Sequence, residues 1–379
     1  MGDRRMTRKR WPFLLLLVGS PVWACTESKP AETHRVWDSA GVRIVETRRD
    51  SWNDETRWLV GPTPSLEIGV REGEEPFQFF GVTGGLRLAS GEIFILNNGT
   101  KSIRVFSPDG RFVREFGREG DGPGEFRALS SIHHLPGDTL LVWDSTGRAF
   151  SLFTPSGTFV RSHRLVGSGS EQLSGVRILQ DGRILAKTYV GPFSGGENQG
   201  PGIVRTTGPV LVFGAGGSLL DTLGTFPNAE MAMMEINGRP AYTPPPFDKY
   251  IFFDVSGGEV FLGTAEAMEV NVRSVAGDLE SIFRSPPVDL AVTEDDRQWY
   301  RNRTLEIATT PEEVAEIEIL LANLPFPETR AAFTDLRLDP DRNVWLRTGR
   351  HYFYYAPSQE WTVVSSEGLF LGTVTLPAD

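Results

Sequence analysis

Short apolar segments with alternating polar positions recur along most of the chain, and each leads into a tight turn that carries glycine. The clearest copies are Phe106-Ser-Pro-Asp-Gly110-Arg-Phe112 and Phe153-Thr-Pro-Ser-Gly157-Thr-Phe159. Further copies have their turn glycines at Gly217, Gly277, Gly368 and, more weakly, Gly41. A short hairpin loop needs one residue at positive φ, and glycine adopts it without steric cost. The pattern therefore predicts a series of β-hairpins.

A second strand lies upstream of five of these hairpins, opened by its own turn at Gly91, Gly137, Gly182, Gly258 or Arg342. Another apolar segment precedes each, such as Gly85-Leu-Arg-Leu88. Four strands per repeat is the composition of a propeller blade. Six turn glycines predict an all-β, six-bladed β-propeller over residues 37–379. The segment Val36 to Val70 is expected to supply most of the last blade, against the C-terminal repeat.

The repeated hairpins and the blade junction Gly120-Asp-Gly-Pro-Gly-Glu-Phe126 resemble those of NHL-repeat-like six-bladed β-propellers, a family that includes many bacterial lipoproteins without assigned activity. The resemblance covers roughly residues 37–379. It implies the propeller fold. Because some related propellers are metal-dependent lactonases or lyases, it also implies that acidic and histidine ligands for calcium or zinc can converge at the central channel.

Residues from about 286 to 332 interrupt the repeat, and their pattern is helical. Thr310-Pro-Glu-Glu313 is a capping-box sequence with proline at the first helical position. Val314, Ile317, Leu321 and Leu324 follow on one stripe. An earlier segment, Thr293 to Ile307, is the second part of this helical insertion, which we expect to pack on the propeller mouth.

Three long segments fall on the same face of a four-stranded-blade propeller, because they are b–c loops or d–a crossovers. They are Tyr189–Gly208, Thr225–Phe247 and Ser285–Ala332. Long loops in a compact domain are often functional. The candidate binding residues on this face are His163, Tyr189, Arg205, Arg239, Tyr242, Trp299, Tyr300, Arg303, His351 and Tyr352. Such residues suit a protein, peptide or glycan ligand, and the alternative is that they are packing residues.

The N-terminus has the organisation of an export signal. A basic stretch precedes the short apolar run Trp11 to Val18, and Val22-Trp23-Ala24-Cys25 resembles a bacterial lipobox, with Trp23 as a departure. This predicts a lipoprotein signal peptide over residues 1–24, lipidation of Cys25 and a polar tether over residues 25–36. A plain cleaved signal is the alternative. Thr26 favours the outer membrane of the cell envelope.

Charge and cysteine content argue against some classes of partner and of metal site. Residues 1–24 carry five basic and one acidic side chain, a net of +4, so the formal charge of −11 becomes −15 without them. This acidity repels phosphate backbones and argues against a nucleic-acid partner. The single cysteine excludes an internal disulfide or a cysteine-based zinc cluster.

Catalytic motifs are scarce. The sequence contains no G-x-S-x-G, H-E-x-x-H or Walker pattern. His133 and His134 are adjacent on a predicted inner strand, so only one of them can face the channel, as a packed residue or a metal ligand. Met231, Met233 and Met234 offer either an adaptable apolar contact or a soft-metal site.

These observations favour a monomeric, non-catalytic binding or scaffold module, held at the envelope by its lipid and using the loop-rich face. The alternatives are a metal-dependent, lactonase-like propeller hydrolase or lyase with calcium or zinc at the channel mouth, and a purely structural envelope lipoprotein.

Overall fold

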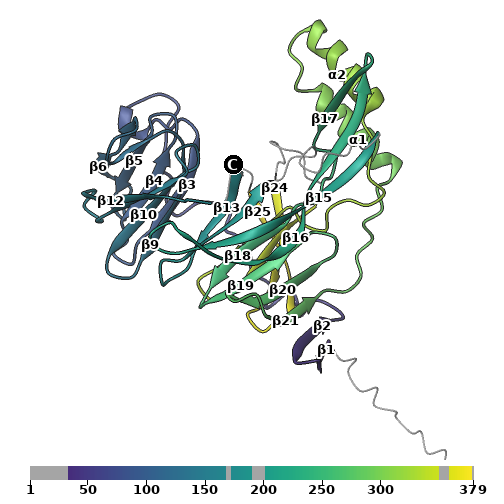
Figure 1. Ribbon diagram of the computed structural model, residues 1–379, viewed down its shortest axis with the longest axis horizontal. Coiled ribbons are helices and arrows are strands. Elements are labelled where there is room, and N and C mark those ends of the chain that lie inside the picture. The colour runs from purple at the N-terminus through teal and green to yellow at the C-terminus, as the bar shows by residue number, and fades with distance from the viewer. Residues whose placement is uncertain (1–32, 168–171, 190–200, 350–357, 378–379) are drawn as a thin grey trace, which may run out of the picture. The chain divides into compact units, whose positions relative to one another are not determined.

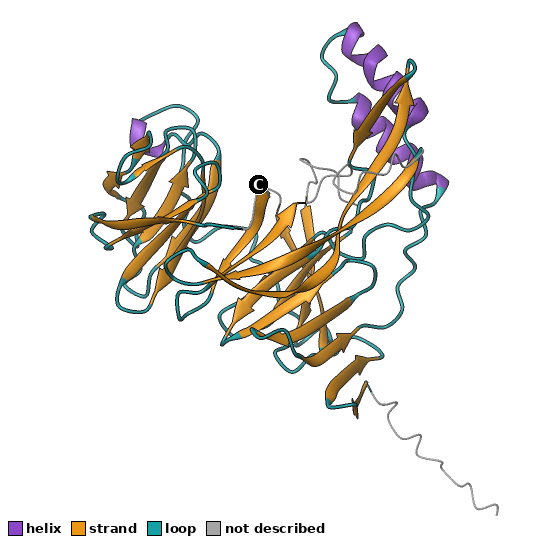
Figure 2. Ribbon diagram, in the orientation of Figure 1, coloured by secondary structure: helices purple, strands orange, loops and turns teal. Residues whose placement is uncertain are grey.

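The computed structural model describes residues 33–167, 172–189, 201–349 and 358–377. About half of these residues form strands, which build five largely antiparallel sheets of at least four strands (Figures 1 and 2). In four of these sheets the order of the strands in space follows their order along the chain, and in the fifth the strands β18 to β21 do so, with the N-terminal hairpin added beside β21. A series of such four-stranded meanders is the architecture of a β-propeller, so the predicted all-β propeller class is confirmed.

The strands of the first two sheets are β3 (Val82–Arg87), β4 (Ile93–Asn97), β5 (Ser102–Phe106) and β6 (Phe112–Phe116), then β9 (Leu129–Leu135), β10 (Thr139–Asp144), β11 (Ala149–Phe153) and β12 (Phe159–Arg164). The third sheet has β13 (Gln172–Ile178), β14 (Ile184–Tyr189), β15 (Gly202–Phe213), β16 (Leu219–Ile236) and β17 (Arg239–Thr243). The last two have β18 (Phe252–Ser256), β19 (Glu259–Gly263), β20 (Glu269–Ser274) and β21 (Leu279–Arg284), then β22 (Asp335–Leu338), β23 (Val344–Thr348), β24 (Ser358–Val364) and β25 (Phe370–Pro377). Two short pieces precede β9: the pair β7 (Arg118–Glu119) and β8 (Glu125–Phe126) at the predicted blade junction, and the 3-10 helix η1 (Glu75–Phe77).

Apolar side chains from consecutive sheets form the cores. Phe94 of the first sheet clusters with Leu140 of the second, and Phe213 of the third clusters with Phe150 of the second. The third and fourth sheets, and the fourth and fifth, share cores of the same kind. Face-to-face packing of alternating apolar positions is what stabilises each blade against the next.

The turn glycines serve a second purpose besides their positive φ. A Cβ on Gly217 would lie 2.3 Å from the carbonyl oxygen of Arg164 in the preceding sheet, and one on Gly277 would lie 2.6 Å from that of Leu223. These contacts are too close for any side chain. The repeated glycine is therefore required both by the turn and by the approach of neighbouring blades.

The N-terminal segment differs from the prediction. The hairpin of β1 (His34–Ser39) and β2 (Val42–Thr47) does not build a separate four-stranded blade with the C-terminal repeat; β2 instead pairs in parallel with the outer strand β21 of the fourth sheet. The following residues Ser51 and Trp52 donate backbone hydrogen bonds to β25. An unpaired outer strand exposes a row of backbone groups, and the segment satisfies them on two sheets. The strand also starts at His34, inside the predicted tether.

Two of the predicted long loops are strands in their described parts. β15 and β16 continue beyond their blade as a hairpin in which Gly202 pairs with Met233, and β17 adds a third strand. We call residues 202–208, 225–236 and 239–243 the ribbon. Ala232 and Met234, two positions apart, lie on one of its faces and are buried. This segment therefore has the two-residue period of a strand, although its length predicts a loop.

The helical insertion is confirmed. α1 (Glu294–Leu305) begins at a capping box on Thr293, and α2 (Pro311–Asn323) begins at the predicted capping box on Thr310. Leu321 and Leu324 of the predicted stripe pack against Ala232 and Met234 of the ribbon. The insertion thus covers the ribbon, and we call the two together the ribbon–helix element.

Candidate functional site

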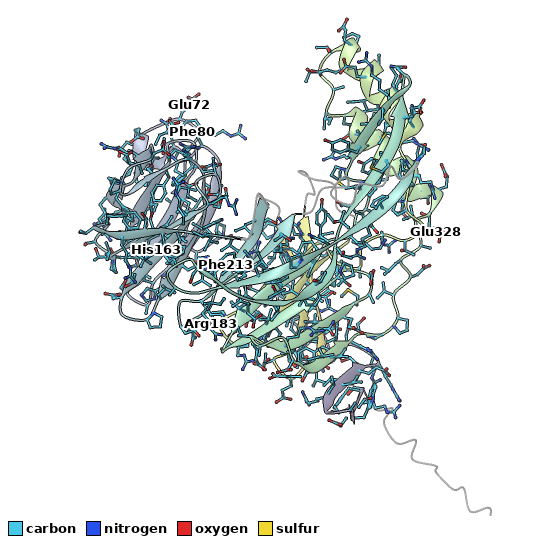
Figure 3. All side chains as sticks on the ribbon, in the orientation of Figure 1. Glu72, Phe80, His163, Arg183, Phe213 and Glu328 are labelled. Carbon is cyan, nitrogen blue, oxygen red and sulfur yellow. The ribbon has the colours of Figure 1, made fainter. Side chains whose placement is uncertain are left out.

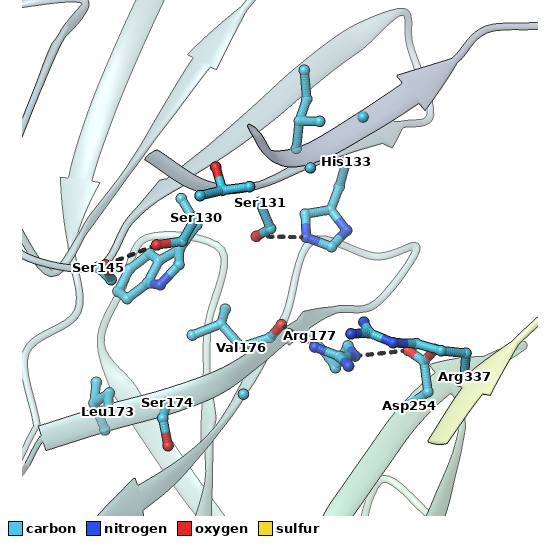
Figure 4. Close-up of a pocket in the computed structure, with 16 residues that line it drawn as sticks. Ser130, Ser131, His133, Ser145, Leu173, Ser174, Val176, Arg177, Asp254 and Arg337 are labelled. Atoms are coloured by element: carbon cyan, nitrogen blue, oxygen red, sulfur yellow. Dashed lines mark hydrogen bonds and ion pairs between the residues drawn. The ribbon is translucent and has the colours of Figure 1, made fainter. Parts of the chain in front are cut away.

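The inner, first strands of the five sheets line a cavity of about 590 Å³. Figure 4 shows a polar and partly charged lining, with hydroxyl groups from β9 and arginines from β13 and β22. The volume is in the range of pockets that hold small molecules. The lining residues are Thr83, Gly84, Gly85, Ser130, Ser131, Ile132, His133, Trp143, Ser145, Leu173, Ser174, Gly175, Val176, Arg177, Asp254 and Arg337.

Arg177 and Asp254 form an ion pair between β13 and β18, with 2.9 Å from the arginine Nε to the aspartate Oδ1. The other carboxylate oxygen, Oδ2, accepts a hydrogen bond of 3.0 Å from the backbone N–H of Leu338. Asp254 therefore joins three sheets. Burial lowers the pKa of Arg177, against the attraction of Asp254 that raises it.

Arg337 is the second cation of the lining. Its Nε lies 3.0 Å from Oδ2 of Asp335, and 54 % of its side chain is exposed, whereas Arg177 is 18 % exposed. The lining thus contains two arginines and a single carboxylate, that of Asp254.

Lys187 lies beside the cavity and adds to its positive charge. Its Nζ donates a hydrogen bond of 2.9 Å to the carbonyl oxygen of Ile251. Burial, reinforced by repulsion from Arg177, lowers the pKa of Lys187 to about 8. Asp335 opposes this shift. The pKa values of the groups around the cavity therefore depend on one another's charge.

His133 is the inward member of the adjacent histidine pair, as the alternation predicts. It lines the cavity with its Nε2 at 3.1 Å from Oγ of Ser131, whereas His134 is near Asp138, outside the lining. Burial, followed by repulsion from Arg177, lowers the pKa of His133 to about 4, so the imidazole is neutral at pH 7. In the described part of the chain, no group of three or more His, Cys, Asp or Glu side chains is placed to hold a metal ion.

The structure gathers six of the predicted binding residues on the ribbon–helix element: Arg205, Arg239, Tyr242, Trp299, Tyr300 and Arg303. Trp299 stacks on Phe247 with 6.2 Å between ring centroids, and Tyr300 packs edge-on against the same ring. Arg303 pairs with Glu306 at 2.5 Å. Arg239 and Tyr242 are exposed on β17. Trp299 and Tyr300 are thus largely packing residues, while Arg239 and Tyr242 face solvent.

Arg205 lies on the ribbon and pairs with Glu266 at 2.6 Å, beside the fourth sheet. The remaining predicted residues are separated from these or lie outside the described part. His163 is on the outer strand β12 of another sheet (Figure 3), where its ring is tilted against that of Phe150 with 5.4 Å between centroids. The side chain of Tyr189 and the residues Cys25, His351 and Tyr352 lie outside the described residues. The three methionines Met231, Met233 and Met234 are buried.

The sequence prediction missed Arg177, Asp254 and Arg337. A signal was present, because Val176-Arg177-Ile178 and Leu336-Arg337-Leu338 place an arginine at the same position of two inner strands. A charged residue repeated between apolar neighbours on an inner strand indicates a charged channel wall. Arg87 of β3 lies one position later in the register, is exposed and does not line the cavity.

A family model described as a 6-bladed beta-propeller matches residues 79–165, which hold the first two sheets. No curated protein matches the sequence. Among solved structures, an exported protein of Bacteroides fragilis is 14 % identical, with a TM-score of 0.45 over 88 % of this chain and 80 % of that one.

Two further structures are similar at 10 % identity and a TM-score of 0.36, over 79 % of this chain. They are virginiamycin B lyase from Staphylococcus aureus, covered over 85 % of its length, and the calcium-binding protein regucalcin from Agrobacterium tumefaciens, covered over 76 %. The matching family model describes a six-bladed β-propeller, and the described residues of this protein form five sheets of that kind; the protein is a β-propeller with a helical insertion.

Proposed function

We propose that this protein is a non-catalytic binding module of the cell envelope, and that the ribbon–helix element is its recognition surface. The observation that carries the proposal is that separate departures from the blade repeat assemble into one element. The ribbon extends one blade, and the helices from an insertion about 50 residues later cover it and share its core (Figures 1 and 2). The blades have their own cores without this element, so it adds surface rather than completing the fold.

The exposed side chains of this element suit a macromolecular partner. Tyr242 on the ribbon is 55 % exposed, Ile307 after α1 is 54 % exposed and Ile319 on α2 is 44 % exposed. Arg239 is exposed on the same strand as Tyr242. Tyrosine and arginine are enriched where binding energy concentrates in interfaces. We propose a protein, peptide or glycan of the envelope as the ligand.

The proposed location at the cell envelope rests on the N-terminal sequence. Cys25 follows a basic stretch and a short apolar run, and a diacylglyceryl group together with an N-acyl chain at this cysteine supplies the two anchors that stable attachment requires. In the described part of the chain, no helix is long and apolar enough to cross a membrane. We propose a monomer attached by lipid, at the outer membrane.

The recognition surface is tested by removing the helices. The insertion ends next to where it starts, because Ala291 and Thr329 form a β-bridge and the N–H of Arg330 donates to the carbonyl oxygen of Leu290 at 2.8 Å. Residues 292–328 can therefore be replaced by a short glycine–serine linker, with Met234→Gln to make the uncovered ribbon polar. We expect this variant to keep its β-sheet circular dichroism and to lose its partners in pull-downs from envelope extracts.

A milder pair of variants controls for unfolding. Tyr242→Ala with Arg239→Gln changes exposed ribbon residues, and Leu220→Asn changes a residue that is 59 % exposed in the blade part of β16. The first should weaken partner capture and the second should not. Unchanged capture by both the deletion and the double variant would contradict the proposal.

The anchor is tested separately with Cys25→Ala. We expect this variant to leave the membrane fraction, because the lipids have no other attachment site. A variant that still sediments with membranes after a high-salt wash would refute the lipid anchor, and would leave the test of the ribbon–helix element untouched.

A further inference from the structure

The cavity of the inner strands has an excess of positive charge inside an acidic protein. Two arginines and one aspartate line it, while the whole chain carries a formal charge of −11. Placing net charge in a partly closed cavity is unfavourable unless an opposite charge balances it. Asp335, outside the lining, pairs with Nε of Arg337 at 3.0 Å, and Lys187 beside the cavity adds a third cation, so three cations are balanced by two carboxylates.

The single carboxylate of the lining is already saturated. Oδ1 of Asp254 accepts from Nε of Arg177 and from the N–H of Val255 at 3.0 Å, and Oδ2 accepts from the N–H of Leu338. These bonds hold Asp254 in place and fix one edge of the guanidinium. Asp254 is therefore a positioning group for Arg177 rather than a group with capacity for a ligand.

The arginines retain donors that no side chain in the described part of the chain engages. Arg177 uses Nε on Asp254 and Nη1 on the carbonyl oxygen of Val176, and its Nη2 meets no acceptor there. Arg337 uses Nε on Asp335, and neither of its terminal nitrogens meets an acceptor there. A guanidinium with a fixed edge and open N–H groups is the group that recognises planar anions.

The backbone at Arg177 is built to place that side chain. The pairing of β13 with β14 shifts register between Ser174 and Arg177, which is a β-bulge. Gly175 within the bulge has a φ of +57°, and a Cβ there would lie 3.2 Å from Cε of Lys187. Bulges redirect side chains next to functional sites. The glycine also leaves the cavity open beside Lys187.

The rest of the lining is neutral and divides into two kinds. Leu173 and Val176 contribute apolar surface, and Leu173 lies apart from the charged end formed by Arg177, Asp254 and Arg337 (Figure 4). Hydroxyl groups come from Ser130 on β9 and from Ser145, directly after β10. Oγ of Ser130 donates a hydrogen bond of 2.7 Å to Oγ of Ser145. A ligand that fits has a charged head and a body with both apolar and hydrogen-bonding parts.

We propose that this cavity is a binding site for a small organic carboxylate, whose carboxylate head is held by Arg177 and Arg337 and whose body lies toward Leu173 and the serines of β9. Neutral His133 and Ser131 lie between the two ends and offer hydrogen bonds to the body. The site uses none of the residues of the ribbon–helix element. It therefore stands whether or not that element binds a partner.

The test is a calorimetric titration of the purified protein at pH 7 and constant ionic strength. The probes are acetate, succinate and phenylacetate, with phenylacetamide as the neutral counterpart and inorganic phosphate as the alternative anion. We expect at least one carboxylate to bind saturably with one site per chain, and the amide to bind at least about tenfold more weakly, because a charge-assisted pair contributes more than a neutral one. Failure of every carboxylate, or equal binding of the amide, overturns the proposal. Tighter binding of phosphate overturns the carboxylate assignment.

Arginine variants identify the site. Arg337→Gln should weaken carboxylate binding about tenfold and, since this side chain is more than half exposed, should fold normally. Arg177→Gln should weaken it more, but it also breaks a buried ion pair. The matched control is Arg87→Gln, an exposed arginine at the end of the inner strand β3 and outside the cavity. Carboxylate affinity that falls equally in Arg87→Gln and Arg337→Gln, or in neither, refutes this site while leaving the partner tests of the ribbon–helix element unaffected.

Discussion

The inner-strand cavity and the ribbon–helix element are two ways in which the same repeated blade acquires specific surface. The cavity uses a position that every blade has, the first strand, and changes only the side chains on it. The ribbon–helix element keeps the blade, lengthens two of its strands and adds an insertion from between the fourth and fifth sheets. Arg177, Asp254 and Arg337 belong to the first kind, and Met234 with Leu321 belongs to the second.

The difference lies in what holds each region together. In the cavity, Asp254 connects β13, β18 and the start of the next sheet, so its bonds belong to the propeller itself. In the ribbon–helix element, α1 and α2 contact the ribbon through a separate apolar cluster. We therefore expect changes in the cavity to affect the whole fold, and changes in the element to remain local.

The largest effect is expected from Leu321→Asp. Leu321 is 7 % exposed between α2 and the ribbon, and burying a carboxylate there costs on the order of 4 kcal/mol. The helices should undock, seen as fast amide exchange over α2, while blade amides keep their protection. Ile319→Asp, on the same helix but 44 % exposed, is the control and should change little. Loss of protection throughout the blades would show that the two regions are not separable.

Asp254→Asn tests the other side of the comparison. It removes the counter-charge of Arg177, and breaking a buried pair lowers the free energy of unfolding by about 3 kcal/mol. The measurement is urea unfolding followed by blade fluorescence, with Asp181→Asn as the control because Asp181 pairs with Arg183 at the surface. Equal stability of the two variants would mean that the cavity pair does not hold the sheets.

The sequence predicts these two regions unequally, for a physical reason. Hairpins, turn glycines and the capping box of α2 depend on residues a few positions apart, so Gly217 and Thr310 are recognisable from local pattern alone. The cavity joins Arg177 to Asp254 across 77 residues. Only the closure of blade upon blade brings them together, and no spacing rule encodes it.

Two predictions about the fold are wrong for the same physical reason. The length of the ribbon departs from the blade and predicts loops, although Ala232 and Met234 keep strand periodicity. The turn at Gly41 resembles the others and predicts a blade for the N-terminal hairpin. Its pairing with β21 depends on which outer edge is free, which is a property of the assembled sheets.

Asp248 gives a pH test at the base of the ribbon–helix element. Burial raises the pKa of Asp248 to about 7, and its hydrogen bond with Tyr250 opposes the shift. The folded state retains a proton that the unfolded chain releases above its ordinary pKa of 3.8, so this group lowers the free energy of unfolding as pH rises from about 4 to about 7.

Asp248→Asn removes that penalty. We expect the variant to be more stable than the parent by about 1–2 kcal/mol at pH 8 and to show no gain at pH 4, in urea unfolding at both pH values. The exposed Asp221→Asn is the control. A gain that is the same at both pH values would mean that lost charge at Asp248 is not the cause.

The smallest effect, from Thr310→Ala, sharpens the comparison most. Oγ1 of Thr310 accepts from the N–H of Glu313 at 3.2 Å, and the Glu313 carboxylate accepts from the N–H of Thr310 at 3.3 Å. Losing such a cap costs about 1 kcal/mol, which corresponds to about fivefold faster amide exchange in the first turn of α2. If the ribbon–helix element opens independently of the propeller, that acceleration stays within α2 and its ribbon contacts, and carboxylate affinity in the cavity does not change. If amide exchange in the blades accelerates by the same factor, the ribbon–helix element and the blades unfold as one cooperative unit. The insertion would then be part of the propeller fold and not an independent surface.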